Sequence, residues 1–269
     1  MPKFWARRIE FQLENLELTM PDLTIDFNID FSDGDDGNVG KITIYNLSDD
    51  TISVLKSDKQ FKLIAGYEDY MGVVLPGIIK EVKTEWERVD KKTTLIVGDN
   101  TDAWLNSTIN KTWKANSYAS QIAPIIADKT GLSIGEISIK SDVKYEKGKT
   151  FSTTCRKALQ EIAKDTDSKL HSSRGKIYLR PNSSTNKIAF NLTSDTGLIS
   201  SPVRINKDSE EENQRYSVMS LFNYKIQTDS LIRIKSKTVE GNFRVIEGNH
   251  QAEGENFYTK MEVEKIETD

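Results

Sequence analysis

Residues 24–31 alternate strictly between polar and apolar side chains, and no other stretch of the chain constrains the fold as tightly. Successive side chains of a β-strand point to opposite faces, so strict alternation predicts a strand that is buried on one face only. The apolar face consists of Ile25, Phe27, Ile29 and Phe31. The polar face consists of Thr24, Asp26, Asn28 and Asp30. The first part of the chain is therefore expected to contain a half-buried β-strand.

Strand-like runs recur through the rest of the first 113 residues. They are separated by turns rich in Gly, Asp or Lys, as in a meander. The runs cover residues 42–45, 61–67, 78–86 and 93–97. We predict one antiparallel β-domain over residues 1–113. A closed or nearly closed barrel is the expected form, because closure removes edge strands that would otherwise pair with other chains.

Helical spacing replaces the alternating pattern in residues 114–190. Apolar side chains recur every three or four residues over 119–126, where Pro124 is expected to kink the helix or to mark its first turn. A second apolar stripe at helical spacing runs over 151–163. A hairpin-like segment follows at 169–180. We therefore predict a small α/β domain over residues 114–190.

Strand patterns return in the last third of the chain. Runs at 231–235, 242–247 and 257–266 predict a second β-domain over residues 191–269. The acidic run at 208–212 is interpreted as a solvated loop. The predicted fold class is thus mainly β with an α/β insert (α+β). It consists of two similar tube-like antiparallel β-barrel domains that flank a small helix-containing domain.

Composition excludes several classes of protein. A formal net charge of -4 and a pI near 5.5 argue against nucleic-acid binding as the main role, because neutralising many phosphates requires clustered Lys and Arg. Cys155 is the single cysteine, so no disulfide can form within the chain. No run of 18 apolar residues occurs, and the first residues lack a hydrophobic segment, so we expect neither a membrane span nor a signal peptide.

Catalytic signatures are missing from the sequence, and we predict that the protein is not an enzyme. The two histidines, His171 and His250, have no partner pattern around them. The loop at 30–38 is acidic, but its spacing does not match a calcium loop. Cys155 lies on an apolar stripe and is expected to be buried and unreactive. No catalytic, cofactor-binding or metal-binding residue and no cofactor is predicted.

Aromatic side chains are candidates for a sugar-binding surface. The four tryptophans could stack on a sugar, but packing in a core or an interface is the favoured interpretation. They are Trp5, Trp86, Trp104 and Trp113. The alternative function is a carbohydrate- or cell-wall-binding protein, in which Tyr118, Tyr145 and Tyr178 of the α/β insert would contact glycan. A third hypothesis is an enzyme that uses acidic residues in a cleft.

Short motifs in both β-regions resemble a known family. In the first region, residues 61–67 and 75–82 are similar to paired strands around a G-x-I element. In the second, residues 230–234, 241–245 and 257–263 are similar to a closing barrel with a G-x-F/Y-x-V strand. Together with the order of domains, these segments resemble the baseplate hub proteins of contractile-tailed phages, including late-control and PBSX-type tail proteins and the hub half of type VI spikes.

The resemblance implies a structural role and a set of partners. In such a family, two tube-like β-domains per subunit and three subunits make a pseudo-sixfold ring that joins the tail tube to the central spike or tip. The implied partners are two further copies of the chain, the tail tube protein, the spike or tip protein and other baseplate proteins. DNA would pass only as cargo, and no membrane insertion is expected. The implied location is the virion tail, assembled in the host cytoplasm.

Overall fold

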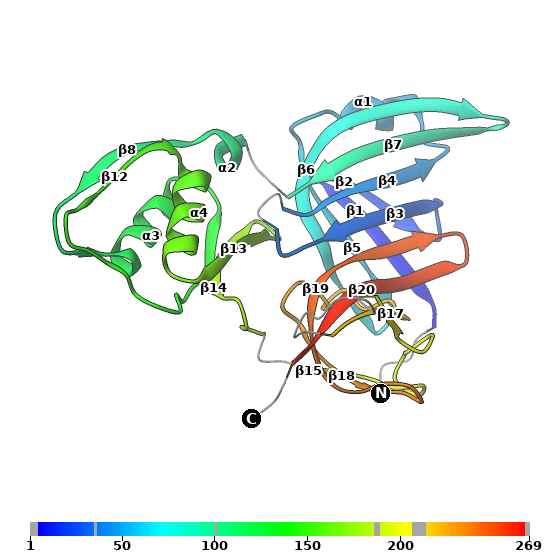
Figure 1. Cartoon of the computed structure of the whole chain (residues 1–269). Coiled ribbons are helices and arrows are strands. Elements are labelled where there is room, and N and C mark those ends of the chain that lie inside the picture. Colours follow the sequence, from blue (N-terminus) through cyan, green and yellow to red (C-terminus); the bar gives the residue numbers. More distant parts are fainter. Residues whose placement is uncertain (1–4, 35–36, 100–101, 186–188, 206–213, 267–269) are drawn as a thin grey trace. The chain divides into compact units, whose positions relative to one another are not determined.

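The computed structural model describes residues 5–34, 37–99, 102–185, 189–205 and 214–266, and it divides the chain into two compact units (Figure 1). The first unit combines residues 1–32, 38–98 and 185–269. The second unit combines residues 99–184 with the short segment 33–37. The chain therefore leaves the first unit after residue 98 and returns to it at residue 185.

The first unit is built on one sheet of 13 strands, almost all of them antiparallel. Its N-terminal part contributes β1 (Arg7–Leu13), β2 (Leu16–Met20), β3 (Ile25–Phe31), β4 (Val39–Tyr45), α1 (Asp49–Val54), β5 (Gln60–Tyr67), β6 (Tyr70–Glu87) and β7 (Asp90–Gly98). Its C-terminal part contributes β15 (Ala189–Leu192), β16 (Val203–Arg204), β17 (Arg215–Leu221), β18 (Leu231–Lys235), β19 (Glu240–Glu253) and β20 (Asn256–Ile266). The strand order is β16-β17-β20-β19-β3-β4-β7-β6-β5-β1-β2, with β15 and β18 as a side branch from β19.

The long strand β19 joins the two β-regions. Its first part pairs with β18, and its last part pairs with β3, from Gly248 opposite Phe31 to Ala252 opposite Phe27. A bulge between Val245 and Glu247 separates the two parts. Bulges bend a strand and increase its twist, so this one lets a single strand serve two differently directed partners. The sheet therefore branches at this point.

Two hydrophobic cores lie on this sheet, one for each β-region. The first core contains apolar residues of β1 to β7, together with Phe222, Ala252 and Phe257 from the C-terminal part of the chain. The second core contains apolar residues of β17 to β20, together with Phe31 from β3. Each core therefore includes side chains from the other β-region.

Two tube-like β-barrels, at 1–113 and 191–269, were expected, but no closed barrel is found among the residues that the structure describes. Both regions belong to one open sheet, whose end strands β16 and β2 do not pair with each other. The edge of β3 is satisfied by pairing with β19 rather than by closure of an N-terminal barrel. Side chains close part of the remaining gap: the rings of Tyr67 and Phe257 lie 5.3 Å apart, and Arg7 Nη1 donates to Gly254 O at 3.3 Å.

The second unit contains three helices and several short strands around its own core. Its elements are α2 (Asp102–Asn106), β8 (Thr108–Trp113), β9 (Ser117–Tyr118), α3 (Ala119–Asp128), β10 (Ser133–Ile137), β11 (Lys144–Tyr145), β12 (Lys149–Thr154), α4 (Cys155–Asp165), β13 (Ser168–Ser173) and β14 (Lys176–Pro181). The unit begins at residue 99 and ends at 184, so its bounds differ from the expected 114–190.

Both predicted helices are present, with one shift of boundary. Pro124 lies inside α3, which continues past it to Asp128. The helix α4 begins only at Cys155, because the Thr154 side chain caps it by accepting from the Lys157 N–H at 3.3 Å. Phe151, which we placed on the helical stripe, belongs to β12 and still reaches the same core. The predicted hairpin at 169–180 is formed by β13 and β14.

Candidate functional site: the outer face of the sheet

The face of the sheet that points away from the first core is polar. In β3 the alternation predicted from the sequence is confirmed: Ile25, Phe27, Ile29 and Phe31 are buried. Asp26, Asn28 and Asp30 lie between them on the opposite face. Because β3 pairs with β4 on one side and with β19 on the other, its polar side chains lie in the middle of a wider polar surface.

Neighbouring strands continue this surface in register. Asn28 lies between Lys41 of β4 and Gln251 of β19, and Asp30 lies opposite Asn249. Asn249 Nδ2 donates to Asn28 Oδ1 at 3.1 Å. Residues directly opposite each other in a sheet have their side chains within contact distance, so these pairs form a continuous row of polar groups. We call the surface carried by β19, β3, β4 and β7 the outer face.

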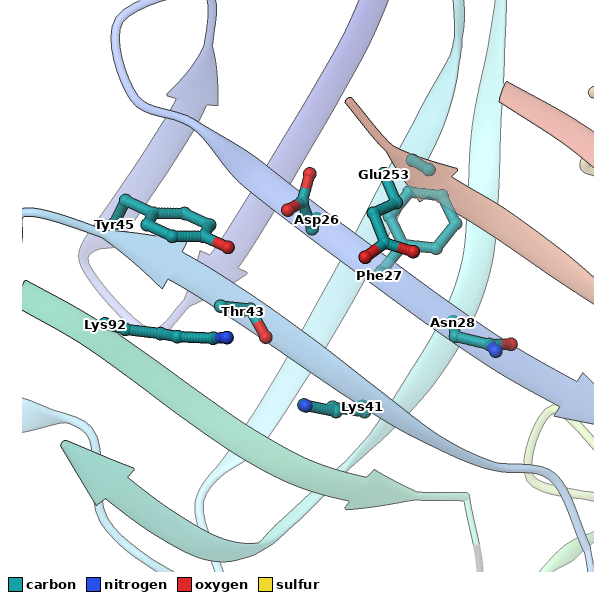
Figure 2. Close-up of a pocket in the computed structure, with 9 residues that line it drawn as sticks. Asp26, Phe27, Asn28, Lys41, Thr43, Tyr45, Lys92 and Glu253 are labelled. Carbon is teal, nitrogen blue, oxygen red and sulfur yellow. The ribbon is translucent and has the colours of Figure 1, made fainter. Parts of the chain in front are cut away.

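A shallow hollow of about 250 Å³ lies in the outer face (Figure 2). Its wall is formed by residues of β3, β4, β7 and β19: Asp26, Phe27, Asn28, Lys41, Thr43, Tyr45, Lys92, Ala252 and Glu253. Figure 2 shows the Asp26 carboxyl between the Tyr45 hydroxyl and Glu253, with the two lysines along the neighbouring strands. The hollow thus presents both signs of charge.

Partial burial raises the pKa values of the acids on the outer face. Burial raises the pKa of the Asp26 carboxyl above its ordinary value, and the nearby Glu253 carboxylate raises it further, while the Gly254 N–H lowers it by hydrogen bonding. Burial also raises the pKa of Asp30. The pKa of the Tyr45 hydroxyl is raised by burial and by the neighbouring Asp26 charge. Each of these net shifts favours the protonated form of its group.

The hollow is lined by acidic, basic, amide and hydroxyl side chains together with Phe27 and Ala252. Its side chains include no histidine, cysteine or serine that could act as a nucleophile or shuttle a proton near neutral pH. Within the described ranges, no group of three or more His, Cys, Asp or Glu side chains is arranged to hold a metal ion. None of the helices in the described part of the chain is both long enough and apolar enough to span a membrane.

Both histidines and the single cysteine are buried. His250 is 2% exposed; Nδ1 lies 2.9 Å from Thr259 Oγ1 and Nε2 lies 3.0 Å from the Ile226 carbonyl oxygen. The His171 ring stacks on Tyr178 with ring centroids 4.9 Å apart. Cys155 is fully buried in the core of the second unit, so its predicted burial is confirmed. The acidic loop at 30–38 includes residues 35–36, which lie outside the described residues.

The aromatic residues divide into packed and exposed groups. Trp104 and Trp113 are buried, as the packing interpretation expects. Trp5 and Trp86 are not packed in a core: their exposed fractions are 64% and 69%. Trp86 was expected inside a strand of a closed barrel. The pairing of β6 with β5 ends at Ile78, and β6 continues beyond it, so Trp86 is exposed to solvent.

The three tyrosines of the glycan hypothesis do not form one platform. The Tyr145 hydroxyl donates to Asp165 Oδ2 at 2.9 Å. The Tyr178 ring stacks on His171, and the Arg180 guanidinium carbon lies 4.4 Å from the centroid of the Tyr178 ring. Both side chains are therefore engaged in internal packing. Only Tyr118, at 38%, is counted among the exposed large side chains. Nothing in the described residues favours a sugar-binding surface here.

Comparison by sequence finds no relative: no protein-family profile matches the chain, and no curated protein is similar to it. Comparison by structure gives matches over nearly the whole chain. A tail protein from Neisseria meningitidis MC58 matches with a TM-score of 0.65 at 9% identity, covering 97% of both chains. The 43 kDa tail protein of prophage MuSo2 from Shewanella oneidensis matches with a TM-score of 0.68 at 11% identity, covering 96% of this chain and 98% of that one.

A secretion component has a similar structure as well. A protein of the E. coli type VI secretion system, itself described as structurally similar to T4 bacteriophage tail proteins, matches with a TM-score of 0.62 at 8% identity, covering 96% of this chain and 77% of that one. The suspected resemblance is thereby confirmed at the level of structure. This chain has, over nearly its full length, the fold of phage tail proteins and of a type VI secretion component.

Proposed function

We propose that the protein is a structural hub component of a phage tail or a related injection machine and that it is not an enzyme. The observation that carries this proposal is the structural likeness to two tail proteins, which covers at least 96% of every chain involved. The likeness includes both β-regions and the helix-containing unit in the same chain order. An assembly role also agrees with the outer face, whose polar side chains extend over four neighbouring strands.

A trimeric ring is the proposed form of this hub. Each chain would contribute the β-regions that precede and follow its helix-containing unit as two tube-like domains, so that three chains present six similar positions to a sixfold tail tube. Identical head-to-tail contacts close into a ring when their rotation divides a full turn. The two cores on one sheet support the proposal, because they give a single chain two wall segments that are held together by β19.

We propose that the outer face lines the channel of this ring. A surface that passes DNA must not neutralise many phosphates, because each neutralised phosphate adds to binding. The hollow is lined by two acids, Asp26 and Glu253, and by two lysines, Lys41 and Lys92, and Asp30 adds a third acid on the same face of β3. The amide row of Asn28, Asn249 and Gln251 is uncharged. DNA would therefore pass as cargo without being held.

The proposed partners follow from this role. One side of the ring would contact the tail tube protein, and the other side would contact a spike or tip protein and further baseplate proteins. The proposed location is the virion tail. Cell-wall cleavage, if the machine needs it, would be carried out by a different protein.

The decisive measurement is the native mass of the purified chain together with its position in particles. The expected result is a species of three 30.5 kDa chains, and a label on the chain at the tip end of isolated tails. A species that stays monomeric at high concentration contradicts the ring, and tails without the label contradict the virion role. A peptidoglycan zymogram is expected to show no clearing, and clearing would contradict the non-enzymatic role.

A further inference from the structure

Charge is distributed unevenly between the two parts of the chain. The second unit, residues 33–37 and 99–184, contains 14 Lys and Arg against 12 Asp and Glu, a formal net charge of +2. The first unit contains 23 against 29, a formal net charge of -6. The overall value of -4 therefore hides a basic part and an acidic part. Charges segregated in this way steer association between unlike surfaces.

Four exposed lysines gather at one end of the second unit. The strands β8 and β12 form a two-stranded ribbon, and β9 and β11 continue it, so that the turns at 114–116 and 146–148 lie side by side (Figure 1). The backbone confirms this closeness, because a Cβ on Gly148 would lie 2.6 Å from the Trp113 carbonyl oxygen and 3.4 Å from the Ala115 nitrogen. The lysines are Lys111, Lys114, Lys144 and Lys147, and we call them the ribbon lysines.

The ribbon lysines differ from the lysine that holds the ribbon in place. Lys149 is paired with Glu161 at 2.5 Å and with Asp165 at 3.1 Å, so its charge is already paired within the unit. Among the described residues, none of the ribbon lysines forms an ion pair. Lys111 lies over the Trp113 ring, 5.1 Å from its centroid, and the other three project from turns or the short strand β11. Their charges are therefore available to a partner.

The chemistry of the cluster favours an acidic protein surface over a nucleic acid. All four charged side chains of the cluster are lysines. Arginine, which binds phosphate through two parallel hydrogen bonds, is not among them. The neighbouring Trp113 is 9% exposed and cannot stack on a base, whereas Tyr118, opposite Lys144, is 38% exposed. Thr112 and Thr150 are exposed on the face of the ribbon opposite to Lys111, with their Oγ1 atoms 3.0 Å apart. Lysine ammonium groups are compact charges, and they can pair with carboxylates that are spread over a protein surface.

We propose that the ribbon lysines dock on the acidic β-unit of a second copy of this chain. This inference rests on the proposed ring, and it names the charged contact that builds it. The occupant follows from charge complementarity, because the chain itself carries a net negative charge on the first unit, residues 1–32, 38–98 and 185–269. A basic surface on one copy and an acidic surface on the next make a contact between unlike surfaces, which is the kind of contact that closes into a ring.

The first test compares two variants that carry the same change in charge. Lys114, Lys144 and Lys147 are replaced by Glu in one variant. Lys129, Lys157 and Lys176, which are exposed on other parts of the same unit, are replaced by Glu in the control. Sedimentation then measures self-association over a range of salt concentrations. We expect the ribbon variant to dissociate at least about tenfold more readily than the wild type, the control to stay within about threefold, and wild-type association to weaken as salt rises.

A second test identifies the occupant directly. A carbodiimide joins lysine amines to nearby carboxylates without a spacer, and a mixture of isotope-labelled and unlabelled full-length protein separates links between copies from links within one. We expect Lys114 or Lys147 to be linked to acidic residues of the β-unit of another copy. Links found only within one copy overturn the proposal, even where the trimer forms.

The remaining outcomes separate the two proposals. A wild-type trimer whose stability is equal in both variants overturns the docking contact and leaves the ring standing. A wild type that is monomeric under all conditions overturns both. Binding of short double-stranded DNA at physiological salt by the wild type and the control, but not by the ribbon variant, assigns the lysines to a nucleic acid and overturns the second copy as occupant.

Discussion

Single residues decide the structure where the two cores meet. Gly248 of β19 lies opposite Phe31 of β3, just after the bulge that divides the strand. A Cβ at this position would lie 2.3 Å from the Lys260 carbonyl oxygen and 2.7 Å from Phe31 Cζ. One of these neighbours is backbone and cannot move aside cheaply. The junction of the sheet therefore requires a residue without a side chain.

Replacing Gly248 by Ala should destabilise the protein markedly. We expect a loss of about 2 kcal/mol or more, because the added methyl group overpacks the junction. Gly98→Ala is the matched control, since its nearest contact would be an ordinary 3.4 Å. Urea unfolding measures both variants. Equal midpoints for the two would show that the junction can relax.

A buried charge cluster holds the second core. Arg244 donates to Asp229 Oδ1 at 3.2 Å and to Glu264 Oε2 at 2.9 Å, and the Asp229 side chain is fully buried. Removing the guanidinium takes away the positive charge that Arg244 places beside the buried Asp229 carboxylate. Arg244→Met should therefore cost about 3–5 kcal/mol in unfolding free energy.

The control for this prediction is Arg215→Met on β17, which is separated from β19 by β20. Arg215 pairs with Glu262 at 3.2 Å, but its side chain is 40% exposed, so the loss should stay below about 1 kcal/mol. Denaturant unfolding at neutral pH compares the two variants. A cost for Arg244→Met as small as that for Arg215→Met would mean that water reaches the cluster.

At the scale of elements, side chains of helix α4 fix the ribbon that carries the proposed docking lysines. Lys149 of β12 lies over the rings of Tyr145 and Phe151, with distances of 4.9 and 5.3 Å to their centroids, and it pairs with Glu161 and Asp165 of α4. Tyr145 donates to the same Asp165. Helix and ribbon are thus joined by one small polar and aromatic cluster.

This cluster predicts a loss of stability at high pH. Burial raises the pKa of the Tyr145 hydroxyl above its ordinary 10.0, and the hydrogen bond to Asp165 raises it further. Burial by itself lowers the pKa of Lys149, but the hydrogen bonds to Glu161 and Asp165 outweigh it, so the pKa is raised above 10.5. Groups with raised pKa in the folded state stabilise it fully below the unfolded value. Their contribution is lost as pH rises further.

The measurement is the unfolding midpoint of the second unit as pH rises from 8 toward the alkaline range in which these groups titrate, above their ordinary values of 10.0 and 10.5. Tyr145→Phe should reduce the alkaline loss, because the variant no longer ionises at this position. Tyr118→Phe, at an exposed position outside the cluster, should leave the wild-type profile unchanged. Identical profiles for all three proteins would exclude Tyr145 as the cause.

At the scale of the whole molecule, the β-unit should behave as one cooperative structure despite its two cores. The strands β19 and β20 contribute to both cores, through Ala252 and Phe257 to the first and Val245 and Met261 to the second. Unfolding one core would therefore strip side chains from the other. The second unit has its own core and does not share these residues.

Ile232→Ala tests this coupling. Ile232 is fully buried in the second core, and its truncation should cost about 2–5 kcal/mol. Hydrogen exchange should then become faster in β4 and β7 of the first core, by a similar free energy, while amides of α3 and α4 keep their protection. Unchanged protection in β4 and β7 would show that the two β-regions unfold separately.

Much of the local structure could be predicted from the sequence. The alternation at 24–31 determines a strand and both of its faces, and hence the polar outer face around Asp26 and Asn28, because side-chain period depends only on the extended backbone. Helical spacing determines α3, α4 and the burial of Cys155 in the same way. These properties are local, so residues within a few positions of each other are enough to specify them.

Pairing between distant strands was decided only by the tertiary structure. No pattern in the sequence shows that β3 pairs with β19, more than 200 positions away, and this pairing is what replaces two closed barrels by one branched sheet. The hollow of the outer face and the position of Trp86 beyond the end of β5 depend on the same registers. Register is set by which edges find partners and by how side chains from both regions fill shared cores, and these are properties of the folded chain as a whole.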